Sequence, residues 1–226
     1  MSRNFGELVD AVVLKDFELK TAIETEVKSW LNDGYMRMAS RDLQCFRKKN
    51  SFAISTASQT YVKDTVLPGY RMMVELWTTS GPIDFISEER AQSVLHYGAT
   101  FTDWNPGPPA TAWIEENTTL YLYPRIDKSY TVYATYYYIP DRMVADADAH
   151  IIPPNKEELL VNYAKILYDF REKDWPAVDR QIAMFENFLE EWEIKDSKLS
   201  KGSSHVLELQ REYNSTLRGR RARIWP

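Results

Sequence analysis

The sequence predicts an α+β protein. We expect a helical bundle made of N-terminal helices and a C-terminal helical hairpin, a central antiparallel β-sandwich or small barrel, and an extended C-terminal tail. Apolar residues recur at helical spacing before Phe46 and after Pro154, whereas Tyr, Val and Thr, which favour strands, dominate the middle. The stretch from Thr118 to Pro154 marks the change, because two strand-like segments and an acidic loop precede a helix start.

These patterns predict four parts. Residues 1–48 form the N-terminal helices of the bundle, and residues 49–153 form the β region with one inserted helix. Residues 154–200 form a C-terminal helical hairpin that packs on the N-terminal helices, and residues 201–226 form an extended basic tail.

Two N-terminal helices follow from apolar stripes. The first spans residues 4–14, and the second runs from Phe17 to Phe46 with Asp16 as its N-cap. The segment Asn32-Asp33-Gly34 interrupts the second stripe, and its glycine either ends the helix or is tolerated inside it at a cost of about 1 kcal/mol.

The central region has a period of two. It predicts strands at residues 52–56, 60–63, 70–78, 83–86 and 112–115, and a helix over residues 88–97 capped by Ser87. Thr119–Tyr123 and Tyr130–Ile139 are the strongest strand candidates. Pro124, Asp127 and Ser129 lie between them, so we expect these two strands to form a hairpin.

Two further helices follow Pro153-Pro154. Asn155 is expected to cap a helix that ends at Arg171, and Asp174 to cap another that ends near Lys198. Their apolar stripes are Leu159, Leu160, Tyr163, Ile166, Leu167 and Phe170 in the first, and Val178, Ile182, Phe185, Phe188, Leu189 and Trp192 in the second.

Composition and charge exclude several classes of protein. The 226 residues contain no apolar run long enough to span a membrane and no signal peptide, and the single cysteine, Cys45, suits a reducing compartment. The net charge is -5, but residues 199–226 hold six Lys and Arg against two Glu, a net of +4, which leaves -9 for residues 1–198. An acidic body argues against a general DNA-binding surface.

No catalytic, cofactor-binding or metal-binding set is expected. The chain lacks the glycine-rich phosphate loops, the Gly-x-Ser-x-Gly elbow and paired cysteines. Asp146, Asp148 and His150 alternate in a way that could supply metal ligands, but a calcium loop would need a central glycine and a late glutamate. We favour a solvated loop, and a metal-dependent enzyme built on these three residues is the minor alternative.

Aromatic residues gather in the β region. Tyr and Trp are enriched at protein–protein interfaces, so we expect a subunit interface there, made by Tyr121, Tyr123, Tyr133, Tyr136, Tyr137 and Tyr138. The alternative is a carbohydrate-binding module that stacks sugars on Trp77, Trp104 and Trp113.

The basic tail finishes with a run of arginines followed by apolar residues. Its arginines precede an apolar end, a pattern that suits an anchor in the acidic groove of a partner better than nucleic-acid binding by charge alone. The predicted anchor residues are Arg218, Arg220, Arg221, Arg223, Ile224 and Trp225.

Several of these motifs together resemble a known family. An I-x-x-x-V-x-x-W-L-N stretch (residues 23–32) precedes a Tyr with a Leu-Pro further on (Tyr61, Leu67, Pro68). An L-Y-L-Y-P-x-x-D-x-x-Y-x-V-x-x-x-Y-Y stretch (residues 120–137) and an acidic loop that runs into Ile152-Pro153 follow. Over most of residues 5–195 the chain resembles the head-to-tail adaptor (connector) proteins of tailed bacteriophages.

The resemblance implies a non-enzymatic virion protein without cofactors, made in the host cytoplasm and located at the head–tail junction. It implies a ring of usually twelve copies that binds the portal protein and tail or nozzle proteins, with double-stranded DNA only passing through its channel. It also implies that the C-terminal segment docks on the portal. No membrane is expected as a partner.

Overall fold

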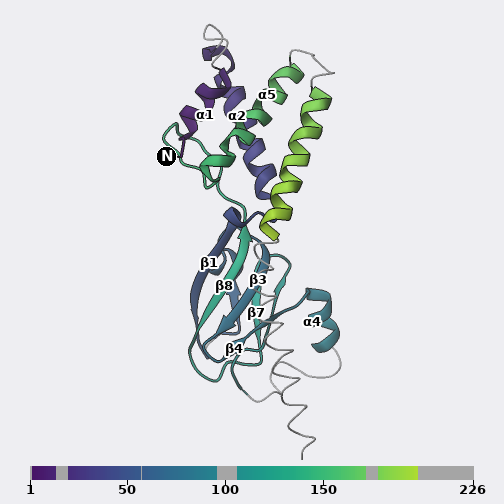
Figure 1. Ribbon diagram of the computed structural model, residues 1–226. Coiled ribbons are helices and arrows are strands. Elements are labelled where there is room, and N and C mark those ends of the chain that lie inside the picture. The colour runs from purple at the N-terminus through teal and green to yellow at the C-terminus, as the bar shows by residue number, and fades with distance from the viewer. Residues whose placement is uncertain (1, 14–19, 57, 96–105, 172–177, 198–226) are drawn as a thin grey trace, which may run out of the picture. The chain divides into compact units, whose positions relative to one another are not determined.

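The computed structural model describes residues 2–13, 20–56, 58–95, 106–171 and 178–197 (Figure 1). Within them it is an α+β protein, as the sequence predicts. The chain divides into two compact units, which we call the helical unit (Met1–Leu43 and Val144–Pro226) and the β unit (Gln44–Met143). The helical unit therefore joins the two ends of the chain, with the β unit inserted between them.

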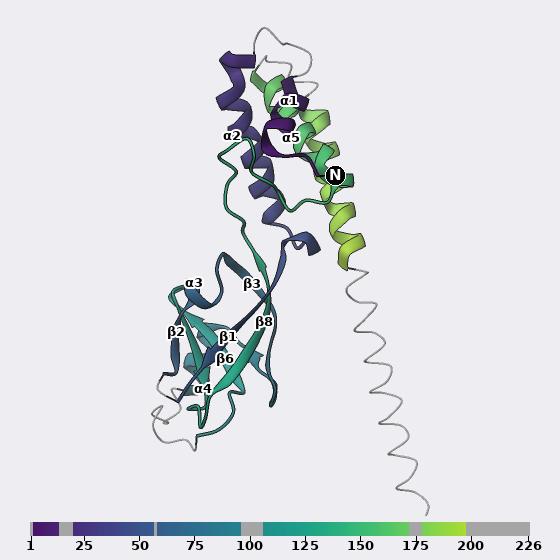
Figure 2. The same cartoon turned by 90° about the vertical axis from the view of Figure 1, so that its left-hand side faces the viewer.

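The helical unit contains α1 (Phe5–Val13), α2 (Lys20–Ala39), the short 3-10 helix η3 (Pro154–Lys156), α5 (Glu157–Arg171) and a further helix over residues 178–197. Its helices α1, α2 and α5 pack against one another (Figures 1 and 2). Asn4 caps α1 reciprocally: its side-chain oxygen accepts from the backbone N–H of Glu7 at 2.8 Å, and its own N–H donates to the Glu7 carboxylate at 2.8 Å.

Gly34 lies inside α2, which is continuous, and permits close helix packing. A Cβ at this position would meet the Tyr163 ring of α5 at 2.8 Å. The helix ends at Ala39, so the prediction that it continues to Phe46 is wrong beyond that residue. The Ser40 hydroxyl donates to the carbonyl of Arg37, and a 3-10 turn, η2 (Gln44–Phe46), then leads into a strand.

Other helix predictions also need correction. No side chain caps η3, where Pro153 occupies the N-cap position and the expected Asn155 lies within the turn. Asp16 and Asp174, the other two expected caps, lie outside the described residues. Phe170 is about half exposed although its spacing places it on the apolar stripe. Spacing identifies one face of a helix, but neighbouring elements decide how much of that face is covered.

The β unit contains two four-stranded sheets, which pack as a sandwich rather than closing into a single barrel. The first sheet has the order β1 (Arg47–Ile54), β8 (Tyr130–Tyr138), β3 (Tyr70–Thr78), β4 (Gly81–Pro82). The second has the order β2 (Thr60–Val62), β7 (Thr119–Tyr123), β6 (Thr111–Glu115), β5 (Asp84–Phe85). All described pairs are antiparallel except β5 with β6.

The hairpin predicted from Thr119 to Ile139 does not form, because β7 and β8 belong to different sheets. β7 instead pairs with β6 through a tight turn at Glu116 and Asn117, both of which have positive φ. Proline, aspartate and serine between two strands mark a change of direction, but they do not specify the partner strand. The segment between β7 and β8 carries the chain from one sheet to the other.

Two smaller elements surround the strands. Helix α3 (Lys63–Val66) lies between β2 and β3, and α4 (Glu88–Leu95) follows β5. The Ser87 hydroxyl accepts from the N–H of Arg90 at 3.3 Å, which fits its predicted role as the cap of α4. Strand β1 begins at Arg47, five residues earlier than the apolar pattern indicates, because its polar first half pairs with Ala134–Tyr137 of β8.

The core of the β unit is filled from both sheets. Tyr136 lies at its centre with no exposed surface, and its hydroxyl donates to the carbonyl of Pro68 at 3.3 Å. Burial raises the pKa of Tyr136 to about 12. The other buried members are Ile54, Val66, Leu67, Leu76, Ile83, Ala112, Leu120, Leu122, Ile126, Tyr130, Val132 and Ala134.

Candidate interaction surfaces

The six tyrosines of the predicted interface fall into three groups. Tyr133 and Tyr137 lie on the outer face of the first sheet, and Tyr121 and Tyr123 lie on the outer face of the second, because each alternates with residues that enter the core. Tyr136 and the partly buried Tyr138 point inward. The strand pattern alone could not separate the two sheets, so it could not show that these rings face opposite sides.

The outer face of the first sheet combines aromatic rings with cations. Trp77 and Tyr133 are paired across β3 and β8 and stack with their centroids 5.8 Å apart and their planes 19° apart. The Arg71 guanidinium lies over the Tyr137 ring, 5.3 Å from its centroid. Arg47 lies 3.8 Å from the carboxylate of Glu75. Stacked rings with guanidinium groups form a surface of the type found at protein interfaces.

The second sheet has a separate aromatic pair. Trp113 and Tyr121 stack with centroids 5.2 Å apart and planes 8° apart, and the Trp113 side chain is buried. Trp77 and Trp113 therefore lie on opposite outer faces of the sandwich and cannot share one sugar ring. Trp104, the third residue of the carbohydrate-binding alternative, lies outside the described residues. The two tryptophans that can be placed do not support a common sugar platform.

The alternating segment Asp146, Asp148 and His150 does not converge on a metal. The Asp146 carboxylate forms a 2.7 Å ion pair with Lys28. Asp148 accepts the N–H groups of Val144 and Ala145, and these hydrogen bonds lower its pKa. Within the described parts of the chain, no three His, Cys, Asp or Glu side chains gather as metal ligands would.

His150 is buried beside Glu157 in the helical unit. Its Nε2 lies 3.6 Å from the Glu157 carboxylate, which also accepts from the Ser2 hydroxyl at 2.8 Å and from the N–H of Arg3 at 3.1 Å. Burial lowers the pKa of His150, and the neighbouring Glu157 charge only partly opposes this effect. The cluster ties the N-terminus to the start of α5, a structural role that the spacing of the sequence did not reveal.

Because the pKa of His150 is lower in the folded than in the unfolded chain, acid should destabilise the protein. Below the unfolded value near 6.5 the unfolded chain binds more protons than the folded chain, so the free energy of unfolding should fall as the pH drops through this region. Urea unfolding at several pH values measures this slope. His150→Gln should flatten it in this window, and an unchanged slope would assign the acid sensitivity to other groups.

The helical unit presents an apolar groove between α5 and the helix over residues 178–197. Met184 and Phe188 are about half exposed on its rim, and Ile182 is also exposed. The predicted stripe of this helix placed Ile182 and Phe188 among the packed residues, so that expectation is wrong for these two. The groove has a volume of about 230 Å³ and is lined by Leu159, Asn162, Lys165, Ile166, Gln181, Met184, Phe185 and Phe188.

Ion pairs fix the helix over residues 178–197 to the region around the end of α2. Glu186 accepts from Arg37 and, at 2.7 Å, from Arg41, while Glu193 lies 3.6 Å from Arg41. The Tyr163 and Phe185 rings add an aromatic contact to α5, with their centroids 5.0 Å apart. The groove is therefore built on helices that several contacts hold in place.

Comparison with known proteins then decides the family. The family model described as SU10 adaptor protein matches residues 3–204, nearly the whole chain. The chain belongs to the SU10 adaptor family. This confirms the resemblance to phage head-to-tail adaptors. A search among curated proteins found no match.

Membership in the SU10 adaptor family identifies a phage adaptor, a structural protein of the virion. It implies a place at the head–tail junction and association with other virion proteins, such as the portal and the tail. No helix in the described ranges is both long and apolar enough to cross a bilayer. The six predicted anchor residues lie beyond the matched range and outside the described residues.

Proposed function

We propose that copies of this SU10 adaptor form a ring beneath the portal that joins the DNA-filled capsid to the tail and lines the DNA channel. The observation that carries the proposal is the family match over residues 3–204. Twelve copies are expected, in keeping with the number that the resemblance implies. The net charge of -9 over residues 1–198 favours passage of DNA over its retention, since an acidic wall repels phosphate.

Exposed apolar and aromatic surface on both units supports an assembly role. Met72, Val74 and Tyr133 are exposed on the β unit, and Met184 and Phe188 on the helical unit. Contiguous exposed apolar surface is typical of contact sites. We infer that neighbouring copies and other virion proteins cover parts of these surfaces.

The tail is proposed to hold the portal. Four of its arginines, Arg218, Arg220, Arg221 and Arg223, would pair with acidic side chains, while Ile224 and Trp225 would enter an apolar pocket. Arginine and tryptophan are among the residue types that dominate the binding energy at interfaces.

The test is to mix the full chain, or a version that ends at Ser204, with the portal ring. We expect stacked rings in electron micrographs only with the full chain, and at least about tenfold weaker portal binding by the truncated version. A full chain with only Ile224 and Trp225 changed to Ser separates the apolar from the charged part of the anchor. Stacking by both versions would keep the adaptor role and reject the anchor. If neither stacks, the ring proposal is contradicted.

A further inference from the structure

The β unit has opposite charges on opposite sides. Residues 44–143 contain nine Lys and Arg and ten Asp and Glu, so the unit is nearly neutral as a whole. Three of its cations, Arg47, Lys49 and Arg71, lie on the outer face of the first sheet. Four glutamates, Glu88, Glu89, Glu115 and Glu116, gather at one end of the second sheet. This separation is invisible in the net charge, because it depends on which strands share a sheet.

We call the outer surface of β1, β8 and β3 the basic face. The ladder places Lys49 opposite Thr135, which lies on the outer side of β8 but is itself buried, and Arg47 opposite the half-buried Tyr137. Arg71 lies over the Tyr137 ring. Lys49 is exposed and has no ion pair among the described residues. Among the residues of these three strands, Glu75 supplies the acidic side chain of the basic face. The positive charges of Arg47, Lys49 and Arg71 therefore outnumber the negative charge there.

We call Glu88, Glu89, Glu115 and Glu116 the acidic patch. The first turn of α4 supplies Glu88 and Glu89, the last residue of β6 is Glu115, and the β6–β7 turn supplies Glu116. The N–H of Glu116 donates to the Glu88 carboxylate at 3.3 Å. Two cations lie nearby. Arg90 follows on α4, and Lys63 donates to Asn117 at 2.9 Å but lies 3.4 Å from Asp64. The patch therefore keeps an excess of negative charge.

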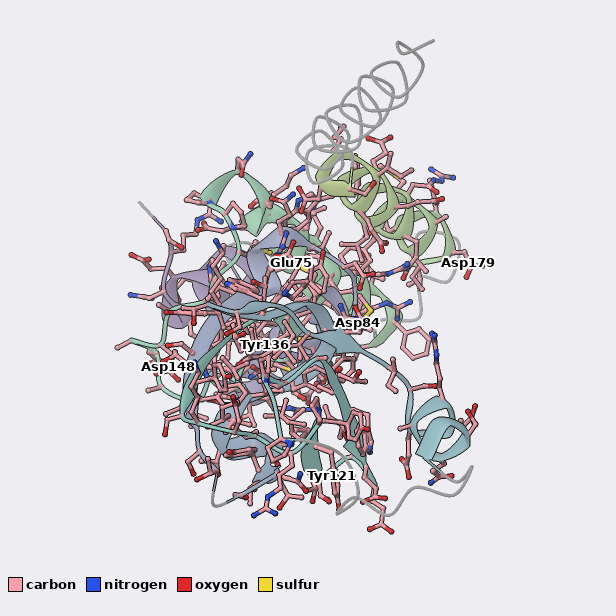
Figure 3. All side chains as sticks on the ribbon, turned by 90° about the horizontal axis from the view of Figure 1, so that it is seen from below. Glu75, Asp84, Tyr121, Tyr136, Asp148 and Asp179 are labelled. Carbon is pink, nitrogen blue, oxygen red and sulfur yellow. The ribbon has the colours of Figure 1, made fainter. Side chains whose placement is uncertain are left out.

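The two surfaces cannot meet within one molecule. In Figure 3, Glu75 of the first sheet and Tyr121 of the second lie on either side of the buried Tyr136. Packed sheets are about 10 Å apart, and the charges lie on the far side of each sheet. Any pairing of the basic face with the acidic patch must therefore join two molecules.

We propose that the basic face of one copy binds the acidic patch of the next copy. This contact is heterologous, since the two partners contribute different surfaces, and such contacts form closed rings when the rotation between copies permits. Contact between two basic faces would place like charges together and is disfavoured. The inference rests on the proposed ring and specifies the surfaces that build it.

The basic face also has the apolar content that an interface needs. Tyr133 is 37% exposed and stacks on Trp77, and Met72 and Val74 of the same sheet are 40% and 36% exposed. Aromatic rings and methionine are enriched at the centres of interfaces, with polar groups at the rim. Here the rings would supply buried area, and Arg47, Lys49 and Arg71 would set the orientation.

Charge reversal tests the inference. Variant A carries Lys49→Glu and Arg71→Glu on the basic face, and variant B carries Glu89→Lys and Glu116→Lys on the acidic patch. Analytical ultracentrifugation and electron microscopy, each with and without the portal ring, measure assembly. Each variant alone should associate at least about tenfold more weakly than the unmodified chain. A one-to-one mixture should assemble again, because every contact then joins opposite charges if A and B alternate.

The control is Arg125→Glu with Lys128→Glu, which makes the same charge change on exposed residues between β7 and β8 and should leave assembly unchanged. Restoration by mixing also shows that A and B are folded. Full assembly of A and B alone, or failure of their mixture, would overturn the inference while the ring stands. No ring from the unmodified chain, even on the portal, would overturn the ring itself. Loss of double-stranded DNA binding by A with intact rings would assign the basic face to nucleic acid instead.

Discussion

Replacing Tyr136 with alanine is expected to lower the free energy of unfolding by about 3–5 kcal/mol, the largest effect of any change considered for this adaptor. The ring is fully buried between the two sheets, and neighbouring strands cannot close the cavity that its loss would leave. Urea unfolding monitored by far-ultraviolet circular dichroism measures the loss.

Tyr136→Phe is the matched control. It keeps the ring and removes only the hydroxyl that donates to the carbonyl of Pro68, so it should cost about 1 kcal/mol.

The Tyr136→Phe variant also tests the raised pKa of the Tyr136 phenol. The folded chain keeps this phenol protonated to about pH 12, whereas the unfolded chain ionises near pH 10, so stability should fall as the pH rises between these values. Tyr136→Phe should remove part of that alkaline loss. Similar stability of the Ala and Phe variants would contradict a central packing role for the ring.

Gly69→Ala is expected to destabilise the protein by about 2–4 kcal/mol. Gly69 has a φ of +70°, which is unfavourable for alanine, and an added Cβ would lie 2.7 Å from the carbonyl oxygen of Ile139. That carbonyl belongs to the main chain, and the N–H of Ile139 donates to the carbonyl of Gly69 at 2.8 Å, which holds the two residues close together. The start of β3 would have to move away from the end of β8.

Two variants separate the causes in the same unfolding assay. Asn tolerates positive φ, so Gly69→Asn should recover only the backbone part of the loss, about 1 kcal/mol, and keep the clash. Gly107→Ala, whose Cβ would meet Pro124 at an ordinary 3.7 Å among the described residues, should be nearly neutral. Full recovery by Asn would show that the carbonyl contact is unimportant.

Candidate surfaces were predictable from the sequence only in part. Tyr and Trp in the strands predicted one aromatic interface, but the structure assigns those rings to two outer faces and the core, and the interface itself stays a prediction. The basic run Arg47-Lys48-Lys49 gave no strand signal, because polar residues lack the alternation by which half-buried strands are recognised. Its place at the edge of a sheet, which turns it into part of the basic face, follows from pairing with β8.

The sequence by itself determined the α+β class, the ranges of most helices and strands, and the resemblance to phage adaptors. These follow from local periodicity and short motifs, which need only neighbouring residues. Only the tertiary structure decided that β7 and β8 belong to different sheets and that His150 is buried beside Glu157. It also decided that α2 runs through Gly34, which packs closely on Tyr163. Each of these depends on contacts between residues far apart in the chain. Such contacts are selected by packing and by the cost of burying polar groups, and local patterns do not encode them.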